Sequence, residues 1–431
     1  MITARAWAGN RYAVYGLARS GLATVEALFA SGAKVAAWDN DSDARSRLPA
    51  GAELVDLDCA DLRPFDSLVV TPGLPLNRHP IAARAREAGV EIIGDVELFA
   101  RARRELPPHK VVGITGTNGK STTTALVHHI LQTAGVPSAM GGNIGLPILA
   151  QDPLPDGGVY VLELSSYQID LTRSLDCDVA MLLNVTPDHL DRYDSFEAYA
   201  ASKARLFEMQ TGGRAAVIAE DDPTTQEIAA RLGREGYWLR NTLLLVSRVD
   251  VGLQSRLPTL QGPHNAQNIA CALAACRHLG VSYATIVQGL ETYPGLPHRM
   301  ERIAQRGGVL FVNDSKATNP TATAPALAAF ERIRWICGGR PKSDSLDECA
   351  RHFGHVRSAY AIGEAAELFE RLLSPHMPVK NCGKLDAAVR AAAADAEAGD
   401  TVLLSPACAS FDQFRDFEDR GDQFRQMVGA L

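Results

Sequence analysis

The sequence lacks several features that mark whole classes of protein. No stretch reaches the roughly 18 apolar residues that a membrane-spanning helix needs, and residues 1–7 carry no apolar core, so we expect no signal peptide. Basic residues form no run and the net charge is −7, which argues against a general nucleic-acid binder. The eight cysteines include no Cys-x-x-Cys pair, a pattern that favours reduced, buried thiols over a zinc site. We therefore expect a cytoplasmic protein that binds neither nucleic acid nor a membrane.

Length and pattern predict three α/β domains. A chain of 431 residues exceeds one ordinary core, and 46% hydrophobic residues is typical of a globular protein. Strand-like apolar runs alternate with helical patterns, which predicts mostly parallel sheets flanked by helices. Proline-rich breaks at residues 105–109 and 293–299 divide the chain. We expect a Rossmann-like domain at 1–106, a P-loop ATPase-like domain at 107–295 and a second Rossmann-like domain at 296–431.

The most informative stretch is residues 111–122. A β-branched apolar run ends in a glycine-rich turn with Gly119, Lys120 and Ser121, and a helical pattern follows. Backbone N–H groups there would bind a phosphate, Lys120 would add a positive charge, and the Ser121 hydroxyl could ligate Mg²⁺. In the common P-loop, four residues separate the first glycine from the Gly-Lys pair, whereas here five residues separate Gly113 from Gly119. A plain strand–turn–helix connection would give no reason for Lys and Ser here, so we predict a nucleoside triphosphate site.

Polar residues at the ends of other predicted strands extend this site. Glu163 ends an apolar strand at the same expected sheet edge, so we interpret it as a Mg²⁺ ligand rather than a solvated acid. His189 lies between Asp188 and Asp191, and the residues alone leave open which of the three would face a metal. Lys203 alone would be an ordinary solvated helix lysine.

The two outer domains give weaker signals. The turn at residues 16–21 has only half of a dinucleotide fingerprint, although Asp39 ends the next strand, where a nucleoside could be read. A nucleotide-binding role and a purely structural role are equally compatible with these residues. In the last domain two lysines and a hydroxyl could hold a carboxylate-bearing substrate, or could belong to ordinary surface loops. The residues there are Asp314, Lys316, Lys342 and Ser410.

Taken together, the motifs resemble those of the Mur ligases of peptidoglycan synthesis. The resemblance spans all three domains in the family's order, at residues 116–121, 141–145, 163–168, 184–193, 264–268, 298–301, 314–319 and 405–414. Segments 314–319 and 410–414 are similar to those of the glutamate-adding member, and the Asp-Asn-Pro-Arg motif typical of ligases for a dibasic third residue is absent. The resemblance implies an ATP-dependent, amide-forming ligase. It would join D-glutamate to UDP-N-acetylmuramoyl-L-alanine through an acyl phosphate and release ADP and phosphate.

The resemblance also implies a role for each matching residue. ATP would be bound by Gly116, Thr117, Asn118, Gly119, Lys120, Ser121, Thr122, Asn265, Asn268, Arg299 and Asp314. The UDP-linked substrate would be bound by Leu17, Ala18, Asp39, Asn40, Thr71, Asn143, Ser165 and Gln168. D-Glutamate would be bound by Lys316, Thr318, Lys342, Ser410 and Phe417. Two Mg²⁺ ions would be held by Ser121, Glu163, His189 and a carbamylated Lys203, and the catalytic residues would be Lys120, His189, Lys203 and Lys316.

Other functions are compatible with parts of the pattern. A sister ligase, such as an L-glutamate-adding enzyme or a folylpolyglutamate synthase, would share the phosphate loop. A P-loop protein that uses ATP for switching would leave residues 314–319 without a role. A dinucleotide oxidoreductase is disfavoured by the incomplete turn at residues 16–21. For the ligase, we expect a monomer with small-molecule substrates only.

Overall fold

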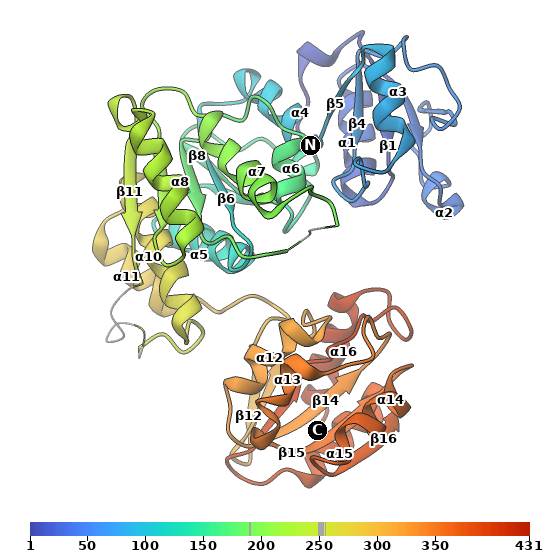
Figure 1. Cartoon of the computed structure of the whole chain (residues 1–431), viewed down its shortest axis with the longest axis vertical. Coiled ribbons are helices and arrows are strands. Elements are labelled where there is room, and N and C mark those ends of the chain that lie inside the picture. The colour runs from blue at the N-terminus through green and yellow to red at the C-terminus, as the bar shows by residue number, and fades with distance from the viewer. Residues whose placement is uncertain (189–190, 249–253, 255) are drawn as a thin grey trace. The chain divides into compact units, whose positions relative to one another are not determined.

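The computed structural model describes residues 1–188, 191–248, 254 and 256–431, and it contains three β-sheets (Figure 1). The chain forms two compact units, residues 1–293 with two of the sheets and residues 294–431 with the third. The predicted domain limits at 106/107 and 295/296 stay predictions. Within the described part of the chain, no helix is both long and apolar enough to cross a membrane.

The first sheet has five parallel strands in the order β3-β2-β1-β4-β5. Its strands are β1 (Arg11–Tyr15), β2 (Lys34–Trp38), β3 (Glu53–Leu54), β4 (Ser67–Val70) and β5 (Glu91–Ile93). Its helices are α1 (Arg19–Ala30), α2 (Ser42–Arg45), α3 (Pro80–Ala88) and α4 (Asp95–Ala102). The strand order reverses between β1 and β4, and open α/β sheets bind ligands beyond the carboxyl ends of strands at such a point.

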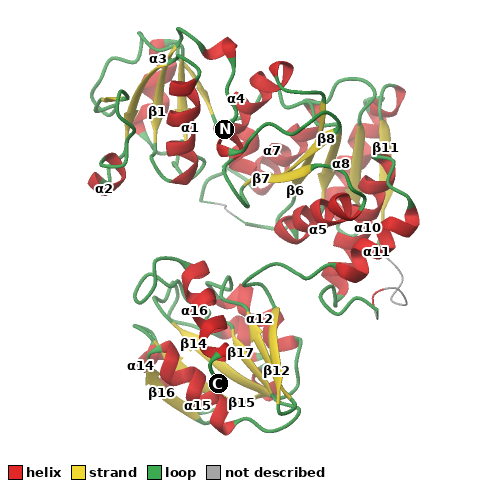
Figure 2. Cartoon of the chain, turned by 180° about the vertical axis from the view of Figure 1, so that it is seen from behind, coloured by secondary structure: helices red, strands yellow, loops and turns green. Residues whose placement is uncertain are grey.

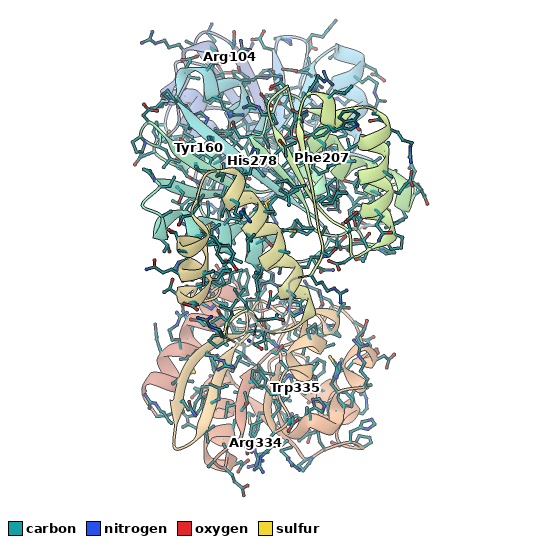
Figure 3. All side chains as sticks on the ribbon, turned by 90° about the vertical axis from the view of Figure 1, so that its left-hand side faces the viewer. Arg104, Tyr160, Phe207, His278, Arg334 and Trp335 are labelled. Carbon is teal, nitrogen blue, oxygen red and sulfur yellow. The ribbon has the colours of Figure 1, made fainter. Side chains whose placement is uncertain are left out.

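The second sheet has six parallel strands in the order β11-β10-β9-β6-β8-β7. Its strands are β6 (His109–Thr115), β7 (Ser138–Gly142), β8 (Gly158–Glu163), β9 (Val179–Leu182), β10 (Ala215–Ala219) and β11 (Thr242–Val246). Its helices are α5 (Lys120–Thr133), α6 (Ser166–Asp170), α7 (Phe196–Glu208), α8 (Pro223–Arg234), α10 (Pro263–His278) and α11 (Tyr283–Thr292). Large buried side chains such as Tyr160 of β8 and Phe207 of α7 contribute to the core of this unit (Figure 3).

The third sheet has the order β12-β13-β17-β14-β15-β16, and it is parallel except for the antiparallel pair β12–β13 (Figure 2). Its strands are β12 (Glu301–Arg306), β13 (Val309–Asn313), β14 (Ile333–Gly338), β15 (Val356–Ile362), β16 (Val379–Gly383) and β17 (Thr401–Leu404). Its helices are α12 (Pro320–Ala328), α13 (Asp347–Ala350), α14 (Ala366–Leu373), α15 (Leu385–Asp395) and α16 (Phe417–Gly429). Trp335 of β14 is buried and donates from Nε1 to the carbonyl of Ser405, 2.7 Å away, so the loop after β17 is fixed to the core (Figure 3).

The predicted fold class is confirmed, because strands and helices alternate along the chain and the sheets are mostly parallel. Gly141 and Gly142 belong to β7, because their backbones pair with Leu162 and Glu163 of β8. One local prediction was wrong. The thiols were expected to be buried, but Cys59 is exposed in a loop before β4, although all eight cysteines are unpaired as expected.

Candidate active site

The predicted phosphate loop lies at the carboxyl end of β6, between β9 and β8 in the sheet. Gly119 has a positive φ of 84°, and a side chain there would approach Asn268 Oδ1 to 2.4 Å, so this position requires glycine. Gly119 is also the N-cap of α5, and no side chain caps that helix. The backbone N–H groups at the start of α5 therefore suit an anion, and the helix dipole favours negative charge there.

The loop after β9 holds the phosphate loop in place. The backbone N–H of Thr117 donates to the carbonyl of Asn184 at 2.9 Å, and the N–H of Asn118 donates to Asn184 Oδ1 at 2.8 Å. Asn184 Nδ2 donates back to the carbonyl of Asn118 at 3.1 Å, and Thr117 Oγ1 donates to the carbonyl of Thr186. These bonds fix the loop without any ligand, which is the preorganisation that electrostatic stabilisation requires.

Two lysine side chains meet at one carbonyl of this loop. Lys120 Nζ donates to the carbonyls of Gly116 and Thr117 at 2.9 and 2.8 Å, and Lys203 Nζ of α7 donates to the carbonyl of Gly116 at 2.9 Å. Only 1% of Lys203 is exposed, and its Nζ lies 4.6 Å from the centre of the Tyr199 ring. Burial, reinforced by the charge of Lys120, lowers the pKa of Lys203 to about 7. Lys203 is therefore part of the loop's surroundings rather than a solvated helix lysine.

Glu163 ends β8, next to β6, and only 2% of it is exposed. Its Oε1 accepts a hydrogen bond from Asn143 Nδ2 at 3.0 Å, whereas its buried Oε2 has no hydrogen-bond partner among the described residues. A buried carboxylate oxygen without a partner is costly, and a cation would satisfy it. Glu163 and the buried Ser121 thus fit a Mg²⁺ ion, which takes oxygen ligands.

The remaining predicted metal ligands are less well defined. His189 lies outside the described residues. Over the described ranges no three His, Cys, Asp or Glu side chains gather in a way that could hold a metal ion. Mg²⁺ commonly takes phosphate oxygens and water among its ligands.

The first sheet brings most of its predicted substrate residues to one edge. Leu17 N donates to Asp39 Oδ2 at 2.6 Å, and a side chain at Gly16 would approach Thr71 Oγ1 to 2.3 Å. Ala18 is the N-cap of α1 and offers no side-chain cap, so this helix start is also open to an anion. Asn40 follows Asp39 in the same loop after β2. The half-fingerprint at residues 16–21 thus has the geometry of a ligand-binding turn.

Two predicted pairs in the second sheet's domain already bond to each other. Gln168 N donates to Ser165 Oγ at 3.2 Å and Ser165 N donates to Gln168 Oε1 at 3.1 Å, which is a capping box for α6. Asn268 Nδ2 donates to Asn265 Oδ1 at 3.0 Å at the start of α10. These contacts give the four residues a structural role, and their substrate contacts stay predictions.

In the second compact unit, Asp314 follows β13 and is buried. Its Oδ2 accepts from Ser405 Oγ at 2.8 Å and its Oδ1 accepts from the N–H of Met300 at 3.2 Å. Burial raises the pKa of Asp314 to about 7, although these hydrogen bonds and the nearby Arg299 oppose the rise. Arg299 lies between His298 and Met300, which both have positive φ angles, 60° and 50°. The predicted ATP contacts of this unit are therefore neighbours.

The predicted amino-acid pocket is assembled from loops after β13, β14 and β17. Lys342 Nζ lies 3.4 Å from Thr318 Oγ1, and Lys316 Nζ lies 5.3 Å from the centre of the Phe417 ring. The backbones of Arg340 and Ala409 form a bridge that joins the loop after β14 to the residue before Ser410, which is buried. These observations place cationic and hydroxyl groups on neighbouring strand-exit loops, as expected.

Comparison with known proteins then assigns the chain to a family. Three family models match it: "Mur ligase MurD-like, N-terminal domain" at residues 10–94, "Mur ligase middle domain" at 114–242 and "Mur ligase, glutamate ligase domain" at 298–408. A protein of Novosphingobium aromaticivorans named UDP-N-acetylmuramoylalanine--D-glutamate ligase is 60% identical over 100% of this chain and 97% of its own length. The chain belongs to the Mur ligase family.

Other relatives and structures agree with this assignment. Proteins of the same name from Sphingopyxis alaskensis and Zymomonas mobilis are 58% and 53% identical, each over 100% of both chains. Among solved structures, a UDP-N-acetylmuramate-alanine ligase from Thermotoga maritima has a TM-score of 0.60 at 16% identity, covering 98% of this chain and 99% of its own. At that identity the structural likeness supports the Mur ligase fold alone.

One buried residue of this Mur ligase was missed by sequence reasoning. Arg420 of α16 is fully buried, and its Nε donates to Ser315 Oγ at 2.9 Å. Its Nη2 donates to the carbonyls of Ser315 and Cys408 at 2.8 and 3.1 Å, and its Nη1 donates to the carbonyl of Ala409 at 3.4 Å. Burial lowers its pKa to about 10. Arg420 thus fixes the residue between Asp314 and Lys316 to the loop that carries Ser410, and an arginine on a polar helix gives no sequence signal for this.

Proposed function

We propose that this chain is an ATP-dependent ligase that adds D-glutamate to UDP-N-acetylmuramoyl-L-alanine and releases ADP and phosphate. The observation that carries the proposal is the set of groups gathered around the phosphate loop. An uncapped helix start, two lysines on one carbonyl and a buried carboxylate oxygen without a partner lie around a single turn. The choice of substrates rests on the name shared by the full-length relatives.

The proposed reaction brings two anions together, the carboxylate of the L-alanine residue and the triphosphate of ATP. A carboxylate oxygen of the L-alanine residue attacks the γ-phosphorus of ATP, the bond to the β–γ bridging oxygen breaks, and ADP leaves. The amine of D-glutamate attacks the acyl carbonyl, loses a proton, and phosphate is expelled. The N-terminus of α5 and Lys120 would bind the phosphates and lower the repulsion between the anions. In the second unit, Arg299 and Asp314 would contact ATP.

Mg²⁺ would neutralise phosphate charge when bound. Ser121 Oγ and Glu163 Oε2 are the groups of this chain that would hold it, since one is a hydroxyl at the helix start and the other a buried oxygen with no protein donor. A second ion near His189 belongs to the proposal through the family resemblance. Asn143 would keep Glu163 oriented, because it already donates to Oε1.

Carbamylation of Lys203 is the second part of the proposal. An amine must be neutral to react with CO₂, and a pKa of about 7 leaves much of Lys203 neutral near physiological pH. The neutral amine forms an N–C bond with CO₂ and releases one proton, so an uncharged group beside Lys120 becomes an anion; two protons are released when the lysine starts as a cation. Lys203→Ala should then lose activity, and added acetate should restore part of it. Full activity of the variant without acetate would contradict the proposal.

The glutamate site would lie in the second unit. The two carboxylates of D-glutamate would pair with Lys316 and Lys342 and with the hydroxyls of Thr318 and Ser410, while Phe417 packs alongside. Lysines serve here as point charges, so no bidentate arginine is needed. The proximity of Lys342 to Thr318 supports this assignment.

A product assay tests the proposed function. The purified protein is incubated with ATP, Mg²⁺, UDP-N-acetylmuramoyl-L-alanine and either enantiomer of glutamate, and the product is identified by mass. We expect a product with D-glutamate only, with one phosphate released per product. Product with L-glutamate only, or turnover with a folate instead of the muramoyl substrate, would identify a sister ligase. ATP hydrolysis that needs no amine would identify a switch protein.

We also propose that the enzyme acts as a cytoplasmic monomer on small-molecule substrates. Eight unpaired cysteines support a reducing compartment. Sedimentation of the purified protein near 46.2 kDa would support the monomer, and about twice that mass would contradict it.

A further inference from the structure

A cluster of contacts joins the first sheet to the loop that follows β9. Arg192, in that loop, donates from Nη1 to the carbonyl of Gly73 at 3.2 Å and from Nη2 to the carbonyls of Pro72 and Leu74 at 3.4 and 2.7 Å. Residues 71–74 form a turn after β4, closed by a bond from Leu74 N to the carbonyl of Thr71. A single side chain therefore gathers three successive carbonyls of this turn.

The contact is made in both directions. Asn77 Nδ2 and Arg78 Nη2, from the segment that follows the turn, donate to the carbonyl of Asp191 at 3.1 and 2.9 Å. We call these five bonds, between residues 72–78 and residues 191–192, the arginine clasp. Its two sides lie more than 100 positions apart in the sequence, in one compact unit.

An aromatic ring also packs against the planar face of the Arg192 guanidinium. Its Cζ lies 4.2 Å from the centre of the Tyr167 ring, which is a cation–π distance. Tyr167 stacks in turn on Tyr193, with ring centres 6.0 Å apart and planes 14° apart. Tyr193 donates from its hydroxyl to Asp170 Oδ2 at 2.8 Å, so the stack is anchored to α6. A planar fork with several donors suits this place, and a lysine would supply neither the stacking nor the set of bonds.

We propose that Arg192 is a positioning residue, which fixes the turn at residues 71–74 against the loop after β9 and so shapes the seat of the UDP-linked substrate. The proposal rests on the proposed function, because it takes Thr71 as a substrate contact. Thr71 N is bonded to the carbonyl of Tyr15 at 3.1 Å, so one end of the turn is held by β1 while the other is held by the clasp. Loss of the clasp leaves three carbonyls of the turn without these donors and lets the turn depart from the substrate-binding shape.

The site of ATP should be insensitive to this loss. The phosphate loop is held by hydrogen bonds to Asn184 and Thr186, in none of which Arg192 takes part, and by Tyr199, whose hydroxyl lies 3.1 Å from Thr117 Oγ1. The clasp therefore predicts a split: the Michaelis constant for the UDP-linked substrate rises and that for ATP does not.

Arg84 provides a matched control. It is half-buried on α3 and also donates to three carbonyls, those of Leu57, Asp58 and Ala60, but all of these lie in its own domain. The experiment compares Arg192→Ala, Arg192→Lys and Arg84→Ala with the wild type in two measurements. The first is amide hydrogen exchange of residues 72–78 in the ligand-free protein. The second is the Michaelis constant for UDP-N-acetylmuramoyl-L-alanine and for ATP.

We expect amide exchange at residues 72–78 to be about 10-fold faster in Arg192→Ala, and the Michaelis constant for the UDP-linked substrate to rise about 10-fold, with that for ATP within about twofold. Arg192→Lys should resemble Arg192→Ala. Arg84→Ala should lower the melting temperature about as much as Arg192→Ala does. It should change neither the amide exchange of residues 72–78 nor the two Michaelis constants. Unchanged exchange in Arg192→Ala would overturn the clasp, and faster exchange with an unchanged Michaelis constant would overturn the positioning role. A wild type that makes no product with these substrates would overturn the proposed function alone, since exchange needs no substrate.

Discussion

The proposed phosphate loop and the proposed amino-acid pocket would both bind anions, but they are built in different ways. The phosphate loop is six consecutive residues, 116–121, held mainly by one neighbouring loop and ordered through backbone groups. The amino-acid pocket takes its residues from positions as far apart as 316 and 417, on three strand-exit loops and a helix. The phosphate loop therefore comes from a single stretch of sequence, whereas the amino-acid pocket forms only when β13, β14 and β17 are packed side by side.

The two sites also differ in what keeps them ordered. Asn184 serves the phosphate loop with a neutral amide, and its bonds lie at the partly exposed edge of the sheet. The pocket depends on Arg420, a buried cation that donates to the hydroxyl and carbonyl of Ser315 and to the carbonyls of Cys408 and Ala409, all neutral oxygen atoms. A buried charge of this kind is costly unless each of its donors is satisfied. The amino-acid pocket is assembled from distant segments and should thus be lost by a change in packing. The phosphate loop is contiguous in sequence and should be lost by a change in charge.

The largest expected effect tests the charge of the contiguous site. Lys120→Ala should lower turnover by about 10³-fold, because one cation at the transferring phosphoryl group is removed. The fold should remain, since Lys120 Nζ donates to the carbonyls of Gly116 and Thr117 in its own loop. Lys110→Ala, an exposed lysine of β6, is the control and should leave turnover unchanged. Steady-state kinetics at saturating ATP decide, and near wild-type turnover of Lys120→Ala would refute the phosphate role.

The second effect tests packing in the assembled site. Arg420→Ala should destabilise the second unit by about 3–5 kcal/mol, because a large buried side chain is removed and its oxygen partners lose their donors. Arg425→Ala is the control on the same helix, since Arg425 forms half-exposed ion pairs with Glu301 and Asp422 that are worth about 1 kcal/mol or less. Calorimetric unfolding of both variants measures the difference. Equal losses would mean that Arg420 does not hold the loops together.

The third prediction tests whether the loss of a single charge weakens the amino-acid pocket. Lys342→Ala should raise the Michaelis constant for D-glutamate by about 30- to 150-fold, the loss of one charged contact, and leave that for ATP nearly constant. Arg340→Ala is the control, because Arg340 pairs with Glu364 on the exposed side of the loop. Kinetics with each substrate varied test this. A glutamate constant that responds to Arg340 and not to Lys342 would move the contact to Arg340.

The smallest expected change, at most about 1.4 kcal/mol for each pH unit, concerns pH. The pKa of Asp314 is raised by burial to about 7, so the folded protein keeps a proton that the unfolded chain loses near pH 4. This group's contribution to stability is full below pH 4 and is lost as pH rises through about 7, at up to about 1.4 kcal/mol per pH unit. Asp314→Asn should flatten that fall. Denaturant unfolding at pH 5, 6 and 7 measures it, and parallel curves for variant and wild type would show that Asp314 is ionised in the folded state.

The sequence predicted the fold class and the phosphate loop because both depend on local pattern. Alternation of strands and helices, and a Gly-Lys-Ser turn between a strand and a helix, are visible in a few residues. Glu163 could be placed for the same reason, since it ends an apolar strand. Arg420 and the arginine clasp could not be predicted, because most of their partners are backbone carbonyls of distant segments. Carbonyls carry no residue-type signal, so only the packed chain reveals which of them an arginine meets.

The positive φ angles of His298 and Met300 have a consequence for the conformational entropy of the chain. His298 and Met300 hold positive φ angles that favour glycine, and each such residue carries a strain of roughly 1 kcal/mol. Glycine would remove that strain but would also give the unfolded chain more freedom to lose, an opposing effect of about 0.4–1 kcal/mol. The two nearly cancel, so stability does not decide the residue at 298. The ring of His298 does, because its Nδ1 pairs with Asn313 Nδ2, whereas glycine would keep the two backbone bonds, from the N–H to Glu301 Oε2 and from Lys316 N to the carbonyl.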